Sequence, residues 1–228
     1  MLAGLAVPDA GLAEILILGG SGRTVATRYP TGSILEEGEV VLATGEALSV
    51  VADGRMKLLK GPVRLAARKG KPARRGMLDR LASAARTVDE RRVALGAVRG
   101  SSRQGGGIDQ DPWAIDIAVS DRFCVQAPER LSLWRADSAA PVRASLEELE
   151  TGSRVFFDWP KGSRIIAWPP QLRPSRAARY LFHSGAGVSR QFDIVLIDGK
   201  LDGTDLLSAL AENRCFYQFD LLINGRLM

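Results

Sequence analysis

Short apolar runs separated by turn residues dominate the first third of the chain and predict a small β structure. The expected strands, in chain order, are Glu14–Leu18, Val40–Leu42, Ala47–Val51 and Met56–Leu59. Asp53 and Gly54, between the last two runs, favour a type I′ hairpin because both central positions of that turn need a positive φ. We therefore expect an antiparallel meander that folds as a small sandwich or barrel.

The pattern changes after residue 67, where apolar residues begin to recur at helical spacing and predict an amphipathic helix over about 76–95. Residues 101–107, which end in three consecutive glycines, have the composition of a flexible linker. We expect residues 67–107 to join two domains, a β module over 14–66 and a second module over 108–228.

The second module shows many short strands with Gly and Pro turns, which is typical of a β-sandwich. The expected strands are Trp113–Val119, Leu131–Trp134, Arg154–Trp159, Arg164–Trp168, Asp193–Ile197 and Phe216–Ile223. A helix near 204–213 is expected to be capped by Thr204. Ser145 and Glu148 match a capping box, but Val142–Leu149 fits a strand equally well. The predicted fold is mainly β, with one linker helix and one short C-terminal helix.

Part of the front module resembles the FecR-type periplasmic β domain. The residues that carry the resemblance are Tyr29-Pro30-x-Gly32-x-x-Leu35, two hairpins and the closing Leu59-x-Gly61-Pro62. The resemblance covers about residues 28–66, and the whole layout is similar to a family of bacterial envelope proteins with no assigned activity. It implies a β module without enzyme activity that takes part in transmembrane signalling by protein contact.

The chain departs from FecR-type regulators in two respects. Its longest uninterrupted apolar run, before Gly19, is four residues, so we expect no complete transmembrane helix. It also lacks a cytoplasmic anti-sigma segment, which argues against a direct role in regulating a sigma factor.

The two cysteines, Cys124 and Cys215, suit a single structural disulfide because their number is even and no Cys-x-x-Cys motif is present. Two buried free thiols are the alternative. A disulfide requires an oxidising compartment and therefore export to the periplasm or beyond. Gly11 and Ala13 fit a signal-peptidase site. Residues 1–13 are thus either the remainder of a cleaved secretory signal or an ordinary N-terminal segment.

The basic residues are concentrated in one segment. The formal charge is +5, yet Arg64–Arg103 carries twelve Lys and Arg against three Asp and Glu, so the rest of the chain is slightly acidic. Such a segment can bind nucleic acid or another anionic surface. The candidate binding residues are Arg74, Arg75, Arg91 and Arg92. The segment has no aromatic residue to stack on bases, which favours a solvated connector instead.

All four Trp residues lie in the second module, and two of them stand directly before Pro. Trp159 and Trp168 are candidates to line a groove for a Pro-rich peptide or a glycan, because flat aromatic faces stack on both. Packing in the core between sheets is the alternative for each.

Candidate chemistry is sparse. One His and two Cys exclude a four-ligand zinc site of the Cys/His type. His183 is the one histidine available as a general base, and no Gly-x-Ser-x-Gly motif accompanies it. We therefore expect no catalytic, cofactor-binding or metal-binding residues.

The sequence as a whole predicts a non-enzymatic periplasmic or secreted protein that binds an envelope protein or assists signalling through protein–protein contact. We expect no nucleic-acid partner. Two alternatives remain: an envelope hydrolase that uses His183, and a binder of nucleic acid or anionic surfaces that uses Arg64–Arg103.

Overall fold

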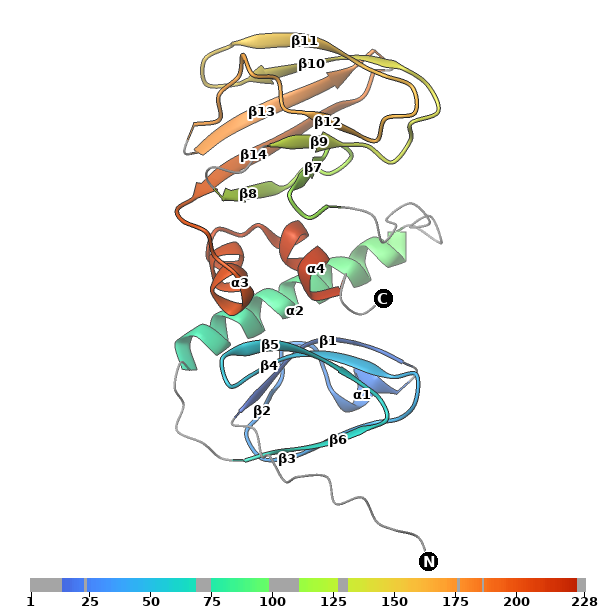
Figure 1. Ribbon diagram of the computed structural model, residues 1–228, viewed down its shortest axis with the longest axis vertical. Helices are drawn as coiled ribbons and strands as arrows, with labels where there is room; N and C mark the ends of the chain where they lie inside the picture. Colours follow the sequence, from blue (N-terminus) through green and yellow to red (C-terminus); the bar gives the residue numbers. More distant parts are fainter. Residues whose placement is uncertain are drawn as a thin grey trace, which may run out of the picture. The chain divides into compact units, whose positions relative to one another are not determined.

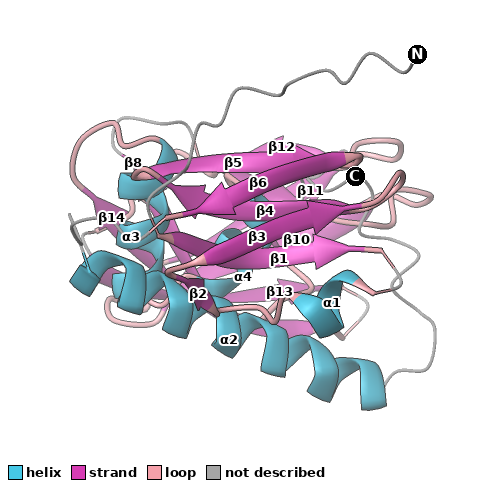
Figure 2. Cartoon of the chain, turned by 90° about the horizontal axis from the view of Figure 1, so that it is seen from below, coloured by secondary structure: helices cyan, strands magenta, loops and turns pink. Residues whose placement is uncertain are grey.

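The computed structural model describes residues 14–22, 24–68, 75–98, 111–126, 131–175, 177–185 and 187–224 (Figure 1). Strands outnumber helices in the described part of the chain, which confirms the mainly β class, and Figure 2 shows the preponderance of strands. None of the helices in this described part combines the length and the apolarity that a membrane span needs.

The chain forms two compact units. Unit 1 runs to Asp89 and includes the chain from Ile223 onward, and unit 2 comprises Glu90–Leu222. The division therefore falls inside two helices, α2 (Arg75–Val98) and α4 (Phe216–Asn224). The glycine-rich residues 101–107, where we expected the domain boundary, lie outside the described residues.

Unit 1 is built from six strands in two sheets, with the short helix α1 (Val25–Arg28) between the first two strands. The strands are β1 (Ile15–Ser21), β2 (Ile34–Leu35), β3 (Gly38–Leu42), β4 (Ala47–Ala52), β5 (Arg55–Lys60) and β6 (Val63–Ala67). One sheet has the order β2-β1-β4-β5, the other is the pair β3-β6, and all pairings are antiparallel.

The expected meander is wrong in one respect, because β3 pairs with β6 and not with its neighbour β4. This arrangement makes two sheets, whose side chains share one core. Val40 and Leu42 of β3 pack there with Leu48 and Val50 of β4. Strand alternation predicts which residues are apolar, but it does not say which strand each one pairs with.

The hairpin between β4 and β5 is as predicted. Asp53 and Gly54 have φ values of 53° and 70°, and Ala52 stands opposite Arg55, so the loop has two residues. Positive φ at both positions is the geometry of a type I′ turn.

Helix α2 confirms the predicted helix and extends it slightly at both ends. Its part in unit 1 buries a run of small and apolar side chains: Met77, Leu78, Leu81, Ala82, Ala84, Ala85 and Val88. On the same part of the helix, Arg86 Nη1 donates a hydrogen bond of 2.7 Å to Gly32 O, in the turn before β2.

Among its described residues, unit 2 has eight strands in two sheets and two short helices. They are β7 (Ala114–Asp116), β8 (Arg122–Gln126), β9 (Ser132–Trp134), β10 (Val142–Glu148), β11 (Arg154–Trp159), β12 (Ile165–Ala167), β13 (Ala177–Ser184), β14 (Ser189–Ile197), α3 (Gly203–Glu212) and α4. The five-stranded sheet has the order β11-β10-β13-β14-β8, and the three-stranded sheet has the order β12-β9-β7.

The two sheets of unit 2 enclose a common core, as expected for a sandwich-like module. Leu133 of the small sheet packs in the same cluster as Leu146, Tyr180 and Phe192 of the large one. The open question about Val142–Leu149 is settled in favour of a strand, because this segment forms β10 between β11 and β13.

The C-terminal segment corrects two expectations. Residues 216–223, expected to form a strand, belong to helix α4. Cys215, Gln218, Phe219 and Ile223 are all buried at helical spacing. A helix brings them to one face, whereas a strand would put the adjacent Gln218 and Phe219 on opposite faces. Helix α3 begins at Gly203 with Asp202 as its N-cap, and Thr204 is a buried residue of its first turn rather than the cap.

Candidate functional site

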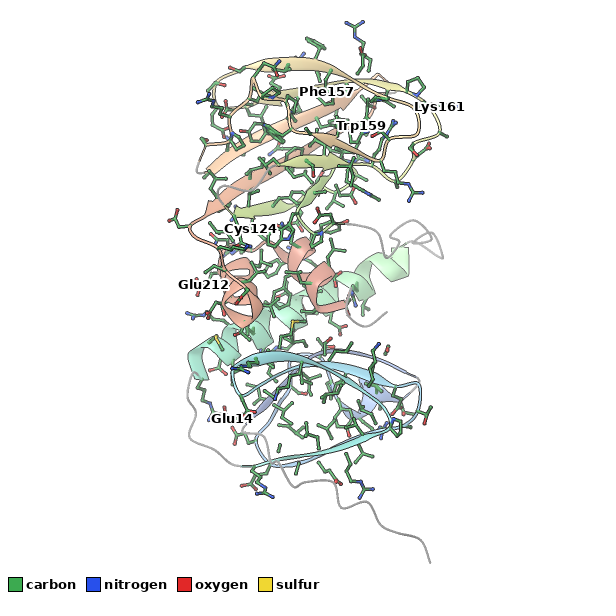
Figure 3. All side chains as sticks on the ribbon, viewed as in Figure 1. Glu14, Cys124, Phe157, Trp159, Lys161 and Glu212 are labelled. Atoms are coloured by element: carbon green, nitrogen blue, oxygen red, sulfur yellow. A yellow bond between two sulfur atoms is a disulfide. The ribbon has the colours of Figure 1, made fainter. Side chains whose placement is uncertain are left out.

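A disulfide between Cys124 and Cys215 joins β8 to the segment before α4 and confirms the predicted bridge. The two Cα atoms are 5.9 Å apart, and both residues are fully buried (Figure 3, Cys124 labelled). Cys215 lies between the two helices α3 and α4, and not at the entrance of the strand expected over Phe216–Ile223.

The side chain of Gln218 adds a second connection between α4 and β8. It is 2% exposed, its Oε1 accepts a hydrogen bond from the Cys124 N–H, and its Nε2 donates to Cys124 O at 2.8 Å. The same Nε2 also donates to Pro112 O at 3.0 Å. The amide thus replaces a missing neighbouring strand at the edge of β8, which satisfies backbone groups that burial would otherwise leave unpaired.

An open cleft of about 440 Å³ lies on unit 2 beside this connection. Its walls come from α2, β8, β14 and the segment that leads into α4. The charged and aromatic side chains that matter to its chemistry are Arg91, Asp121, Arg122, Asp193, Arg214 and Phe216.

The disulfide holds the walls of the cleft together. Arg122 lies two residues before Cys124, and Arg214 and Phe216 flank Cys215 directly. Because the bridge fixes β8 against the start of α4, it fixes the distance between these side chains as well.

Two of the three arginines in the cleft are neutralised by neighbours. Arg91 pairs with Asp121 and Arg122 with Asp193, each across 3.3 Å, and the Arg91 guanidinium lies 4.7 Å from the centre of the Phe216 ring. Arg214 is exposed and forms no ion pair with any residue that the structure describes. The cleft therefore carries one unneutralised guanidinium.

This arrangement can bind a carboxylate. A guanidinium presents paired N–H donors that match the two oxygens of a carboxylate, and Phe216 adds an aromatic side chain to the lining of the same cleft. The sequence did not predict this cleft, although it carries a signal for it, since an arginine stands one or two residues before each cysteine.

The candidate residues Trp159 and Trp168 do not line a groove. Trp159 is fully buried and Trp168 is 8% exposed, so both belong to the core of unit 2 (Figure 3, Trp159 labelled). Each indole N–H donates to a nearby backbone carbonyl, Trp159 to Ser163 O and Trp168 to Leu172 O. The core alternative is therefore the one that the structure bears out.

The basic candidates are held in ion pairs within the chain. Arg75 pairs with Glu36 at 2.7 Å, Arg91 pairs with Asp121, and Arg92 donates to Asp220. Arg74 lies outside the described residues. The three described candidates are thus each paired with an acid that is distant in sequence.

His183 lies near the end of β13, where its Nδ1 is 2.7 Å from Ser189 Oγ. Within the described part of the chain, no carboxylate orients this ring, and no group of His, Cys, Asp and Glu could hold a metal ion. Burial, assisted by the charges of Glu148 and Glu150, raises the pKa of Tyr180 to about 12, so this phenol stays protonated in the core.

Comparison of the chain with protein-family models and with curated proteins gives no match. The disulfide, the cleft and the surface of the molecule are therefore the features that bear on its function.

Proposed function

We propose that this protein is an exported, non-enzymatic binding protein of the bacterial envelope that acts through contact with another protein. The observation that carries the proposal is the buried disulfide between Cys124 and Cys215. Structural disulfides persist in oxidising compartments and are rare in the cytosol, where thiols are kept reduced.

The FecR-like resemblance of residues 28–66 is consistent with this proposal. The two packed sheets of unit 1 form a small β module of the kind that the resemblance implies. We propose that this module also serves protein contact.

The cleft on unit 2 is the part of the surface best suited to a protein partner. A partner's acidic side chain or terminal carboxylate would pair with Arg214 and lie against Phe216. A nucleic-acid partner would need unpaired cations for its phosphates, whereas Arg75, Arg91 and Arg92 are each held in an ion pair with an acid.

A hydrolase that uses His183 has little support. Its neighbour Ser189 is an exposed hydroxyl on β14, and a serine nucleophile needs a base that is itself oriented by a third group. In the described part of the chain, His183 contacts Ser189, but no carboxylate binds the histidine ring to complete a triad.

Export is tested by the intact mass of the protein purified from its host, with free thiols alkylated before lysis. We expect an unalkylated protein that gains about 2 Da on reduction and begins near Glu14. Alkylation of both cysteines before reduction would contradict the proposal.

Binding at the cleft is tested by photo-cross-linking in the host. A photoreactive residue at Gln191, on the cleft wall, should give an adduct with a protein, whereas one at the exposed Lys161 should not. The Arg214→Glu substitution should abolish the adduct, and Arg173→Glu, the same charge reversal at an exposed site elsewhere on unit 2, should preserve it. An adduct that persists in Arg214→Glu, or that contains nucleic acid, would refute the proposal.

A further inference from the structure

The two edges of the five-stranded sheet in unit 2 differ. At one edge, Gln218 of α4 pairs with the backbone of β8. At the other edge, β11 is bonded to β10 on its inner side, and no strand in the described part of the chain pairs with its outer side. Figure 1 shows β11 at the rim of this sheet. Its outward N–H and C=O groups can therefore accept another strand.

Strand β11 lacks several of the features that usually protect an edge. Its sequence, RVFFDW, contains no Lys and no Pro, and its two charges point away from the core. Phe156 on the outer face is 63% exposed, while Val155 and Phe157 on the other face pack against the core. An edge that exposes an aromatic side chain and carries no Lys or Pro can pair with another strand.

We propose that β11 pairs antiparallel with β11 of a second copy of this chain, around a two-fold axis that passes through Phe156. The alternation of the strand restricts the register. Core-facing residues must meet core-facing residues if the two sheets are to continue into one, so the axis must pass through a residue and not between two residues.

Charge complementarity selects the register centred on Phe156. In this register Arg154 of each copy lies opposite Asp158 of the other, so two opposite-charge pairs form. Phe156 meets its own copy on the outer face, and Val155 meets Phe157 on the core face. A shift of the axis to Val155 or to Phe157 would instead place a charged residue opposite Phe156.

The residues around this register also fit. Pro160 follows the strand directly and has no N–H, so the ladder ends after Trp159. Asp158 has no ion pair with any residue that the structure describes, so its carboxylate is free for Arg154 of the second copy. The contact of Arg154 with Glu147 is an exposed cross-strand pair that can be shared.

The register is tested by cysteine cross-linking of the full chain under mild oxidation. Arg154→Cys mixed with Asp158→Cys should give a disulfide-linked heterodimer, because these positions lie opposite each other. Arg154→Cys alone should not cross-link, because its two copies are offset by four residues, or about 13 Å along the strand. Equal cross-linking of both samples, or none in the mixture, would overturn the proposal.

Association itself is measured by sedimentation equilibrium from about 1 µM to about 1 mM protein. We expect a monomer–dimer equilibrium that Phe156→Lys abolishes and that Asp158→Lys weakens by about tenfold or more, since two attractive pairs become repulsive. Glu37→Lys, the same charge change at an exposed site in unit 1, should leave the equilibrium unchanged. A monomer at every concentration, or a dimer that resists Phe156→Lys while circular dichroism shows a native fold, would refute it.

Discussion

At the scale of single residues, buried hydrogen bonds connect segments of unit 2 that are distant in sequence. Gln218 is the clearest case, because one side-chain amide satisfies both the N–H and the C=O of Cys124 and reaches Pro112 as well. Leaving such buried groups unpaired costs far more than the modest net gain of forming the bonds.

Replacing Gln218 by Met retains the length and the apolar volume of the side chain but leaves the Cys124 backbone unpaired. We expect the free energy of unfolding to fall by about 2–4 kcal/mol, measured by urea denaturation. Gln191→Met, the same change at an exposed position, should alter it by less than about 0.5 kcal/mol. Equal effects of the two substitutions would show that the hydrogen bonds of Gln218 contribute little.

Glu46 makes a pH-dependent contribution to unit 1. The Ala43 N–H, the Thr24 hydroxyl and the Arg28 guanidinium all bind its carboxylate and lower its pKa from the usual 4.5, with the Ala43 bond as the largest cause. A folded-state pKa below the unfolded one means that the stabilisation is complete above 4.5 and is lost as the pH falls through the folded value.

We therefore expect Glu46→Gln to lower the melting temperature near neutral pH, with a difference from the unmodified protein that narrows as the pH drops below 4.5. Thermal unfolding over a pH series measures this difference. If the difference in melting temperature between the two proteins stays constant below pH 4.5, ionisation of Glu46 does not cause the loss of stability.

At the scale of elements, the packing of α2 on the turn before β2 depends on one glycine. Gly32 has φ +77°, and a Cβ atom there would lie 2.6 Å from Ala82 O and 2.5 Å from Arg86 Cγ. The helix can approach the turn this closely only because position 32 has no side chain.

The Gly32→Ala substitution should thus destabilise unit 1 through two effects, the strained φ and the clash with α2. Gly45→Ala is the matched control, since Gly45 has φ +82° with nothing within 4 Å of an added Cβ. We expect Gly32→Ala to cost about 1–3 kcal/mol more than Gly45→Ala in chemical denaturation followed by far-UV circular dichroism. Equal losses of unfolding free energy in the two variants would show that α2 shifts to accommodate the added methyl group.

Two helices show when the spacing of apolar residues predicts secondary structure and when it does not. Helix α2 is 24 residues long, so its helical period repeats often enough to be unmistakable in the sequence. Helix α4 has 9 residues, most of them apolar, and such a short run is equally compatible with a strand. The helix puts the adjacent buried residues Gln218 and Phe219 on one face together with Ile223, which a strand would not do.

At the scale of the whole molecule, the disulfide is the principal covalent constraint. It spans 91 residues, and a bridge of that span removes unfolded-chain entropy worth about 4–5 kcal/mol in the loop-closure model. Because the bridge also positions Arg122, Arg214 and Phe216, its loss should affect both stability and the cleft.

The Cys124→Ala/Cys215→Ala double variant should lose several kcal/mol of stability in unit 2. All four tryptophans lie in that unit, so the urea midpoint measured by tryptophan fluorescence reports on it directly. We expect that midpoint to fall in the variant, and to fall similarly when the unmodified protein is reduced. An unchanged urea midpoint would show that the disulfide does not stabilise unit 2.

The sequence by itself determined the mainly β class, the long helix, the hairpin at Asp53-Gly54 and the pairing of the two cysteines. Each of these depends on local spacing, turn chemistry or a count of residues, which are properties of the chain alone. Only the tertiary structure decided that β3 pairs with β6, that Trp159 and Trp168 are buried, that Arg75, Arg91 and Arg92 are ion-paired and that a cleft lies beside the disulfide. These features depend on which distant segments meet, because burial and charge compensation are properties of the neighbours that folding brings together.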